Sequence, residues 1–309
     1  MTALAPPPDR VAIRSNPTGG RSKPVAWMVW PALLMFTAFG VIPLVGVLGL
    51  SFTQWDGIDD VIKPAGLDSW TAVLTEPGLL HALWVTFLVM ALSWVFQTPM
   101  SLLIGVFLAA HKRYRGFLAV LYFIPLLLSS AAIAITFSAL LNPNFGLGAG
   151  LGVELLNQDW LGQGNLALGV LVFVVSWQFI PFHSLIYQGG IRQIPTSMYE
   201  AAEIDGAGKI RTFFSITLPQ LKYTIITSST LMVVGSLTFF DLIFVLTGGG
   251  PGDATRVLAL EMYQTGFKAN LMGPASVIAV ILVLVGLGLA LLLRRLGGGG
   301  SADSQLEGA

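Results

Sequence analysis

The sequence predicts an all-α polytopic membrane protein with six transmembrane helices and a cytoplasmic loop of short helices between the fourth and the fifth. Composition is the first reason: 54% of the 309 residues are hydrophobic, mean hydropathy is +0.77, and only 10% are charged. Soluble domains carry about 25% charged residues. The other two reasons are six long apolar runs and a regular alternation of basic residues along the chain.

Composition also excludes several functions. Lys and Arg number 16, as do Asp and Glu, so the formal net charge is zero and no overall basic field favours nucleic acid. Cysteine is absent, which excludes disulfides, thiolate metal sites and cysteine nucleophiles.

The chain begins with a segment that we expect to be a disordered cytoplasmic tail, residues 1–24. It contains a run of three prolines and four basic residues, and it has no periodic apolar pattern. The first apolar run, 25–50, follows this basic segment as a signal peptide would. However, a signal peptide has an apolar core of about 7–15 residues. This run is longer, so we interpret it as a retained transmembrane helix.

Five more runs each supply the roughly 20 apolar residues that cross about 30 Å of hydrocarbon. They are residues 79–110, 117–141, 166–190, 223–247 and 274–293. Prolines inside these runs are compatible with transmembrane helices, because neighbouring helices can satisfy the backbone groups that proline frees. Together the spans predict a transmembrane domain over 25–293. The Gly/Ser-rich residues 294–309 are expected to form a flexible tail.

The distribution of basic residues predicts the orientation. Thirteen of the 16 Lys and Arg residues lie in the N-terminal tail, in connections 111–116 and 191–222, and after the last span. Only Lys63, Arg256 and Lys268 lie in the alternate connections. Cytoplasmic loops carry the excess of basic residues. Both termini and connection 191–222 are therefore predicted to be cytoplasmic.

Connection 191–222 contains the longest polar segment that is compatible with helix, residues 199–219. Pro195 suits the first turn of a helix, and Asp205-Gly206 suits its end. A second helix is predicted from about Lys209 to Leu218, closed by Pro219, with a shared face formed by Ile210, Phe213, Phe214 and Thr217. Such a helical hairpin either contacts a partner in the water or packs only against its own spans.

Several motifs in this connection resemble a known family. Glu200-Ala201-Ala202, Asp205-Gly206-Ala207, Ile216 and Leu218-Pro219 resemble the EAA loop of membrane subunits of binding-protein-dependent ABC importers. Ile194-Pro195 and Tyr199 are similar to the carbohydrate branch of that family. Phe240-Asp241 and the TGGGP segment, 247–251, resemble permeases of the maltose-F and glycerol-phosphate-A type. The resemblance extends over about residues 25–293.

The resemblance implies the permease subunit of an ATP-driven sugar importer in the bacterial inner membrane, which would form half of the translocation pathway. It also implies that the EAA loop is a coupling helix inserted into a cleft of a cytoplasmic ATPase, with Glu200 contacting a basic residue there and Gly206 forming the elbow. The partners implied are a second homologous permease, two copies of the ABC ATPase, an extracytoplasmic sugar-binding protein and the lipid bilayer, without nucleic acid.

ATP hydrolysis is expected outside this chain. No GxxxxGK[ST] motif occurs in the sequence, so ATP and Mg²⁺ would be bound by the partner ATPase. No metal-ligand motif or catalytic triad stands out, and His81, His111 and His183 are interpreted as structural. We therefore expect no cofactor, no metal and no enzymatic activity in this chain.

Candidates for the substrate path come from the fourth and fifth predicted spans. Asp241 is the only acidic or basic residue well inside a predicted span, where an ionisable group indicates function. Sugars have apolar CH faces and polar edges, so aromatic rings beside hydrogen-bonding groups suit them. The residues that offer these groups are Trp177, Gln178, Phe182, Ser236, Phe239 and Phe240. Helix packing explains the aromatic residues equally well, and a hydrogen bond to backbone would explain Asp241.

Three other functions compete with the sugar importer. An ABC importer for another polar solute would carry the same motifs. An ion-coupled secondary transporter would need an ion site, for which only Asp241 is available, and the chain has no detectable internal repeat. A membrane-embedded enzyme lacks a catalytic constellation in this sequence.

Overall fold

The computed structural model describes residues 27, 29–109, 113–153 and 157–296. The predicted N-terminal tail, 1–24, and residues 297–309 of the predicted C-terminal tail lie outside the described residues. The described chain is helical almost throughout, and it separates into two compact units, Met1–Gly46 and Val47–Ala309. Each unit is considered by itself.

The first predicted span forms one helical run made of α1 (Val29–Phe36), η2 (Thr37–Val41) and α2 (Ile42–Leu50). The π-helical turn η2 stands just before Pro43, and the Ile42 N–H donates to the carbonyl of Thr37. None of the side chains in this run is buried. A long helix that is apolar and unburied on all sides is suited to lipid.

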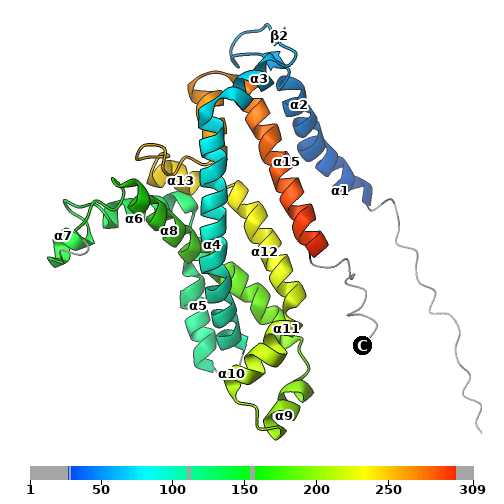
Figure 1. Ribbon diagram of the computed structural model, residues 1–309, viewed down its shortest axis with the longest axis vertical. Coiled ribbons are helices and arrows are strands. Elements are labelled where there is room, and N and C mark those ends of the chain that lie inside the picture. The colour runs from blue at the N-terminus through cyan, green and yellow to red at the C-terminus, as the bar shows by residue number, and fades with distance from the viewer. Residues whose placement is uncertain (1–26, 28, 110–112, 154–156, 297–309) are drawn as a thin grey trace, which may run out of the picture. The chain divides into compact units, whose positions relative to one another are not determined.

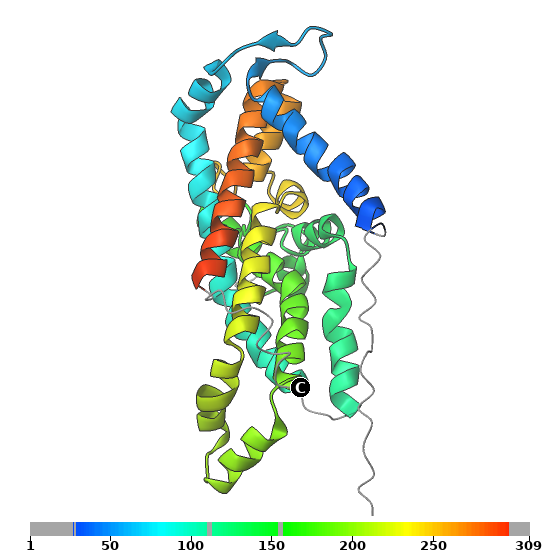
Figure 2. The same cartoon turned by 90° about the vertical axis from the view of Figure 1, so that its right-hand side faces the viewer.

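The second unit is built on α4 (Pro77–Ala109) and α8 (Gly164–Arg192), which pack against each other (Figure 1). Helix α12 (Lys222–Leu237) contacts α4, α8 and α15 (Met272–Leu296), as Figure 2 shows from the side. The ends of α4, α8 and α15 lie within three residues of the predicted spans, because their apolar runs are unbroken.

The largest apolar core surrounds α8. Its members come from α4, α6 (Ser130–Leu140), α8, α13 (Asp241–Leu246), α14 (Leu258–Tyr263) and Val257 just before α14. The most deeply buried among them are Ala134, Leu171, Val174, Val175, Ile243 and Leu260.

The third predicted span is wrong as a single helix. Helices α5 (Arg113–Leu127) and α6 are bent against each other by 95°. Pro125 lies in the last turn of α5, and the Ser129 side chain accepts a hydrogen bond from the Ala132 N–H, which starts α6 in a new direction. The short helix α7 (Leu147–Leu151) follows.

The fifth predicted span is interrupted. Helix α12 ends at Leu237, and α13 begins at Asp241. The hydroxyls of Ser236 and Thr238 donate to the carbonyls of Val233 and Gly235, at 2.7 and 2.8 Å, and so compete with the helical ladder. The 16 residues of α12 reach about 24 Å, less than the roughly 30 Å of hydrocarbon.

Four helical runs in the described chain are long and apolar enough to cross a bilayer, and the bent pair would make a fifth. These four runs are Val29–Leu50, Pro77–Ala109, Gly164–Arg192 and Met272–Leu296. The count of six spans therefore stays a prediction.

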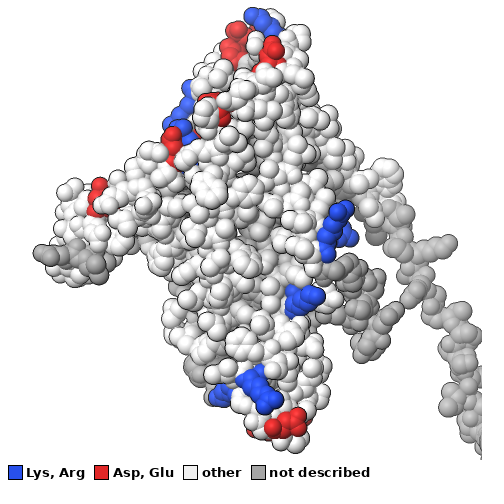
Figure 3. Space-filling view, in the orientation of Figure 1, with Lys and Arg blue, Asp and Glu red and all other residues white. Residues whose placement is uncertain are grey.

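The two ends of the second unit carry its polar elements. One end holds the antiparallel pair β1 (Thr53–Gln54) and β2 (Lys63–Pro64), then α3 (Asp68–Thr75), α14 and η5 (Gln264–Lys268). The other end holds α9 (Thr196–Ile204), α10 (Lys209–Thr212), η4 (Phe213–Thr217) and α11 (Leu218–Gln220). In the view of Figure 3, acidic atoms gather toward these two ends, and the middle of the unit shows almost none.

Candidate functional site

The helical hairpin α9–α11 contains the EAA residues, and its elbow has a defined geometry. Helix α9 starts at Thr196, with Pro195 just before it rather than inside its first turn. At its end, the Gly206 N–H donates to Glu203 O at 3.0 Å and the Ala207 N–H donates to Ala202 O at 2.8 Å. These two bonds form a Schellman motif around Gly206, whose φ of +71° favours glycine.

The second arm differs from the predicted helix in where it ends and in the exposure of its residues. Helix α10 continues through the π-helical turn η4 into α11, so the helical run extends to Gln220 and includes Pro219. The four residues that were predicted to share one face differ in exposure. Thr217 is buried and Phe213 half-buried, whereas Ile210 and Phe214 are 77% and 60% exposed. The predicted single face of four residues is therefore wrong.

The inner side of the hairpin is fixed to the helical bundle. A cluster of buried residues joins Leu102 of α4, Tyr187 of α8, Ile194 and Leu221. Residues of both arms pack against this cluster, namely Met198, Tyr199, Phe213, Ile216 and Leu218. A displacement of the hairpin would therefore push directly on α4 and α8.

The outer side of the hairpin is free and mixed in character. Ile204 is 86% exposed, and Ile210 and Phe214 are exposed on the second arm. The charged residues of the same hairpin are also exposed, namely Glu200, Glu203, Asp205, Lys209 and Arg211. We call these eight residues the hairpin tip. Of the other EAA residues, Ala201 is exposed, Ala202 is buried and Ala207 is half-buried. An exposed apolar group rimmed by charge is typical of a protein interaction site.

The candidates from α8 do not converge on one site. Trp177 lies edge-on to Phe137 of α6, with ring centroids 5.4 Å apart. Gln178 is buried, and its side-chain N–H donates to Ser130 Oγ at 3.1 Å, at the bend between α5 and α6. Phe182 lies edge-on to His183, whose Nδ1 is hydrogen-bonded to the buried Ser228 Oγ at 2.9 Å. His183 thus links α8 to α12, and its structural role stays a prediction.

The candidates at the end of α12 lie at the break between α12 and α13. Ser236 is buried and bonded to its own helix, and Phe239 is stacked on Phe179 at 5.4 Å. Phe240 is stacked on Phe244 and contacts Tyr263. Asp241 is the first residue of α13 and is exposed. It therefore lies at a break between two helices. The sequence had placed it inside a continuous span, and that placement is wrong.

A buried polar row on α4 was missed. Ser93, Gln97 and Ser101 follow one another at every fourth position, which places them on the same side of the helix, and all three are buried. Ser101 donates to the carbonyl of Ile180 on α8 at 3.3 Å. The sequence feature that could have revealed this row is the presence of polar residues at every fourth position within an apolar run.

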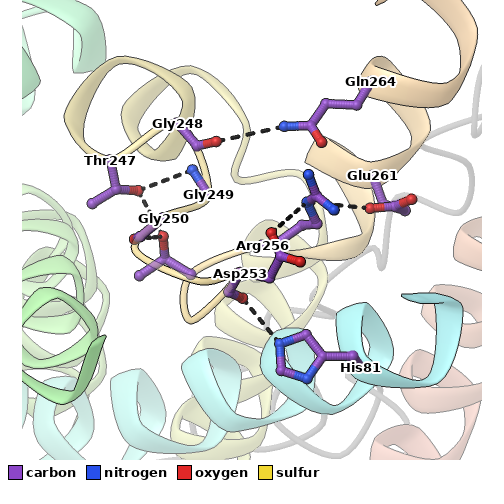
Figure 4. Close-up of polar contacts among 10 residues, drawn as sticks. His81, Thr247, Gly248, Gly249, Gly250, Asp253, Arg256, Glu261 and Gln264 are labelled. Carbon is purple, nitrogen blue, oxygen red and sulfur yellow. Dashed lines mark hydrogen bonds and ion pairs between the residues drawn. The ribbon is translucent and has the colours of Figure 1, made fainter. Parts of the chain in front are cut away.

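The TGGGP segment forms a compact loop between α13 and α14 (Figure 4). The hydroxyls of Thr247 and Thr255 lie 2.7 Å apart, and Thr255 Oγ1 donates to Gly250 O at 2.9 Å. The amide of Gln264 donates to Gly248 O at 3.5 Å. These bonds close the loop on itself and attach it to η5.

Ionic contacts connect the same loop to its neighbours. Arg256 lies between Asp253 and Glu261, at 3.3 and 3.5 Å, and His81 Nε2 lies 3.0 Å from Asp253 O (Figure 4). Burial raises the pKa of the Glu261 carboxyl, and the nearby Arg256 acts in the opposite direction. The loop is thereby held against α4 and α14.

Comparison with known proteins identifies the family. The model of the family described as "Binding-protein-dependent transport system inner membrane component" matches residues 101–297. The chain belongs to this family. The permease is thus a multi-pass membrane component of a transport system, and its family is not one of catalytic enzymes.

Curated relatives are permeases of similar length. The permease is 31% identical to the probable ABC transporter permease protein YurN of Bacillus subtilis, over 89% of this chain and 96% of the relative. It is 31% identical to the multiple sugar-binding transport system permease protein MsmF of Streptococcus mutans, over 82% and 88%. It is 32% identical to the trehalose/maltose transport system permease protein MalF of Thermococcus litoralis, over 83% and 88%.

Solved structures share the fold. A chain of a bacterial alginate ABC transporter, crystallised in complex with a periplasmic protein that holds an alginate pentasaccharide, matches with a TM-score of 0.76 and 20% identity. The match covers 88% of this chain and 93% of the other. A second crystal structure of a bacterial ABC transporter that imports alginate matches with a TM-score of 0.77.

Proposed function

We propose that this permease forms half of the translocation pathway of an ATP-driven importer of mono- or oligosaccharides in the inner membrane of a bacterium. The observation that carries the proposal is the helical hairpin, whose tip is exposed while its inner side shares a core with α4 and α8. The relatives named for multiple sugars and for trehalose and maltose support a saccharide cargo.

In this proposal the permease crosses the membrane six times. The bent pair α5–α6 forms the third crossing, and the interrupted pair α12–α13 forms the fifth. Broken helices are tolerated at membrane depth where protein surrounds them. The distribution of basic residues supports cytoplasmic termini and a cytoplasmic hairpin between the fourth and fifth crossings.

The hairpin tip would insert into a cleft of a separate ABC ATPase, present in two copies that bind ATP and Mg²⁺. Glu200 would pair with a basic residue of that cleft, and Ile204, Ile210 and Phe214 would bury their apolar surface in it. Ala201, Asp205 and Ala207 would complete the contact around the Gly206 elbow, with Ala202 packed beneath. The cluster around Tyr187 and Leu221 would then transmit closure of the ATPase to α4 and α8.

A second homologous permease would complete the pathway, and an extracytoplasmic binding protein would deliver the sugar. The alginate transporter in complex with its periplasmic protein supports this arrangement. Asp241, at the break between α12 and α13, would face the path together with Trp177, Gln178, Phe182, Ser236, Phe239 and Phe240.

Copurification tests the assembly. The permease is isolated from its native membrane in mild detergent, and its partners are identified by mass spectrometry. We expect a second six-span permease and a P-loop ATPase. Recovery of the chain alone or as a homo-oligomer, even after cross-linking, would contradict the proposal. Uptake by the reconstituted complex should require ATP, and uptake driven by an ion gradient instead would point to a secondary transporter.

A further inference from the structure

A hollow of about 340 Å³, lined by both apolar and charged side chains, lies where the β1–β2 pair, α3 and the start of α15 meet. These elements lie at the end of the unit opposite the hairpin (Figure 1). Its lining includes Trp55, Asp56, Asp59, Lys63, Asp68 and Asn270. This volume is within the range of small-molecule sites in proteins, which begins at about 300 Å³. Nothing in the coupling role of the hairpin requires such a hollow.

The walls of the hollow are fixed by contacts among three separate segments. Thr53 pairs with Pro64, and its carbonyl accepts a hydrogen bond from Ser69 Oγ of α3 at 2.9 Å. The Met272 N–H of α15 donates to Trp55 O at 2.9 Å. At Gly273 any Cβ would collide with the Thr53 carbonyl, so the strand can approach α15 only because this residue is glycine. A site held in this way is preorganised.

The tip of the β1–β2 loop is held by further hydrogen bonds. The indole N–H of Trp55 donates to Asp59 O at 2.8 Å, which orients its ring. One carboxylate oxygen of Asp56 accepts from the N–H groups of Ile58 and Asp59, at 2.9 and 2.8 Å. These bonds lower the pKa of Asp56, so its carboxyl is ionised at neutral pH.

The charged groups of the hollow do not neutralise one another by contact. Within the part of the chain that the structure describes, the ion pairs shorter than 4.0 Å are those of Arg256. Lys63 therefore forms none with the three carboxylates of the hollow. The hollow contains three carboxylates, those of Asp56, Asp59 and Asp68, and one ammonium group, that of Lys63, so negative charge is in excess. The carboxylate oxygens are available as acceptors for hydroxyl donors.

This chemistry matches an uncharged sugar. The apolar CH face of a pyranose can stack on the half-buried indole of Trp55, and its hydroxyls can donate to carboxylates or accept from Lys63 and Asn270. The negative excess disfavours uronates and sugar phosphates. We propose that this hollow binds one uncharged saccharide unit on the extracytoplasmic side of the permease. The inference rests on the proposed function for its orientation and for a saccharide cargo.

Direct binding to the intact chain in lipid nanodiscs tests the inference. The probes are maltotriose and the anionic trigalacturonate, and binding is followed by saturation-transfer-difference NMR. We expect maltotriose to bind and trigalacturonate to bind about tenfold more weakly or not at all. Trp55→Ala should weaken maltotriose binding by about tenfold or more, since the stacking face is lost. The matched control is Ile58→Ala, because Ile58 is exposed in the same loop and does not line the hollow.

A second variant distinguishes loss of the binding site from misfolding of the loop. Ala72 of α3 lines the hollow and is exposed, so Ala72→Trp fills the space without removing any contact of Trp55. Loss of maltotriose binding in both Ala72→Trp and Trp55→Ala supports the site. Absence of a maltotriose signal in the unmodified chain, or full binding by Ala72→Trp, would overturn it. Copurification of the ATPase is measured separately. The coupling proposal can therefore be supported when the saccharide site is contradicted, and the saccharide site can be supported when the coupling proposal is contradicted.

Discussion

Tyr199 of α9 and Thr217 of η4 join the two arms of the hairpin, with a hydrogen bond of 3.1 Å between their side-chain oxygens. Thr217 is buried, so its hydroxyl depends on this partner. The bond closes the hairpin above the cluster that links it to α4 and α8. It therefore fixes the angle at which the tip is presented.

Tyr199→Phe removes the phenolic hydroxyl and keeps the ring. We expect a loss of about 1–2 kcal/mol in the stability of the hairpin, because a buried hydroxyl loses its partner. Thermal unfolding in nanodiscs and hydrogen exchange of α9 measure the effect. Tyr223→Phe, at an exposed tyrosine of α12, is the control. Equal effects of the two substitutions would contradict a special role for the contact.

Substitutions of Gly206 test whether the elbow of the hairpin is needed for coupling. Gly206→Ala places a side chain at φ +71° and should cost about 1–2 kcal/mol. Gly206→Pro cannot adopt this φ and also removes the N–H that donates to Glu203, so we expect normal membrane insertion without transport. Gly208→Ala is the matched control, since Gly208 has φ −69° in the same turn. Full uptake by a stably expressed Gly206→Pro variant would contradict the coupling assignment.

Phe213 and Phe214 are adjacent in sequence and serve different sides of the hairpin. Phe213 packs against the anchoring cluster, so Phe213→Ser should lower stability by about 2 kcal/mol. Phe214 is exposed, so Phe214→Ser should leave the Tm of the isolated permease nearly unchanged and weaken ATPase binding by about tenfold. The Tm and the ATPase recovered by copurification separate the two effects. An unchanged ATPase yield with Phe214→Ser would mean that the tip is not the contact.

Sequence reasoning recovered the long helices and missed the breaks. Hydropathy placed α4, α8 and α15 to within three residues, because an unbroken apolar run needs only a helix to satisfy its backbone in lipid. The bend at Ser129 and the interruption at Thr238 coincide with side-chain bonds to the backbone, at Ala132 and Gly235. A hydropathy window averages over such residues and cannot detect them.

At the candidate site, the elbow at Gly206 followed from residue type, because few residues other than glycine adopt a positive φ. The exposed and buried faces of the second arm could not be predicted from residue type in the same way. Ile210 and Phe214 are exposed whereas Phe213 packs inward, and the arm passes into a π-helical turn at Phe213–Thr217, where the assumed period of 3.6 residues does not hold. The hollow beside Trp55 joins segments more than 200 residues apart, which local patterns cannot bring together.

Glu200 and Glu203 provide a matched pair on α9. Both are exposed, and they lie three residues apart on the same short helix. If Glu200 contacts a basic residue of the ATPase, Glu200→Lys should abolish coupling and reduce ATPase recovery by about tenfold or more, since a charge pair becomes a repulsion. Glu203→Lys should have a smaller effect. A larger effect at Glu203 would place the contact there instead.

Glu261 should make the stability of the permease depend on pH. Burial raises the pKa of its carboxyl above the ordinary value of 4.5, and Arg256 only partly opposes this. A raised folded-state pKa contributes stability that is present below the unfolded value and is lost as the pH rises through the folded value. Glu261→Gln keeps the shape and cannot ionise. Its Tm should therefore exceed that of the unmodified chain at neutral pH, and the difference should shrink toward zero below about pH 4, where both side chains are neutral. A Glu261→Gln variant that is less stable at neutral pH would show instead that the ion pair with Arg256 outweighs the cost of burial.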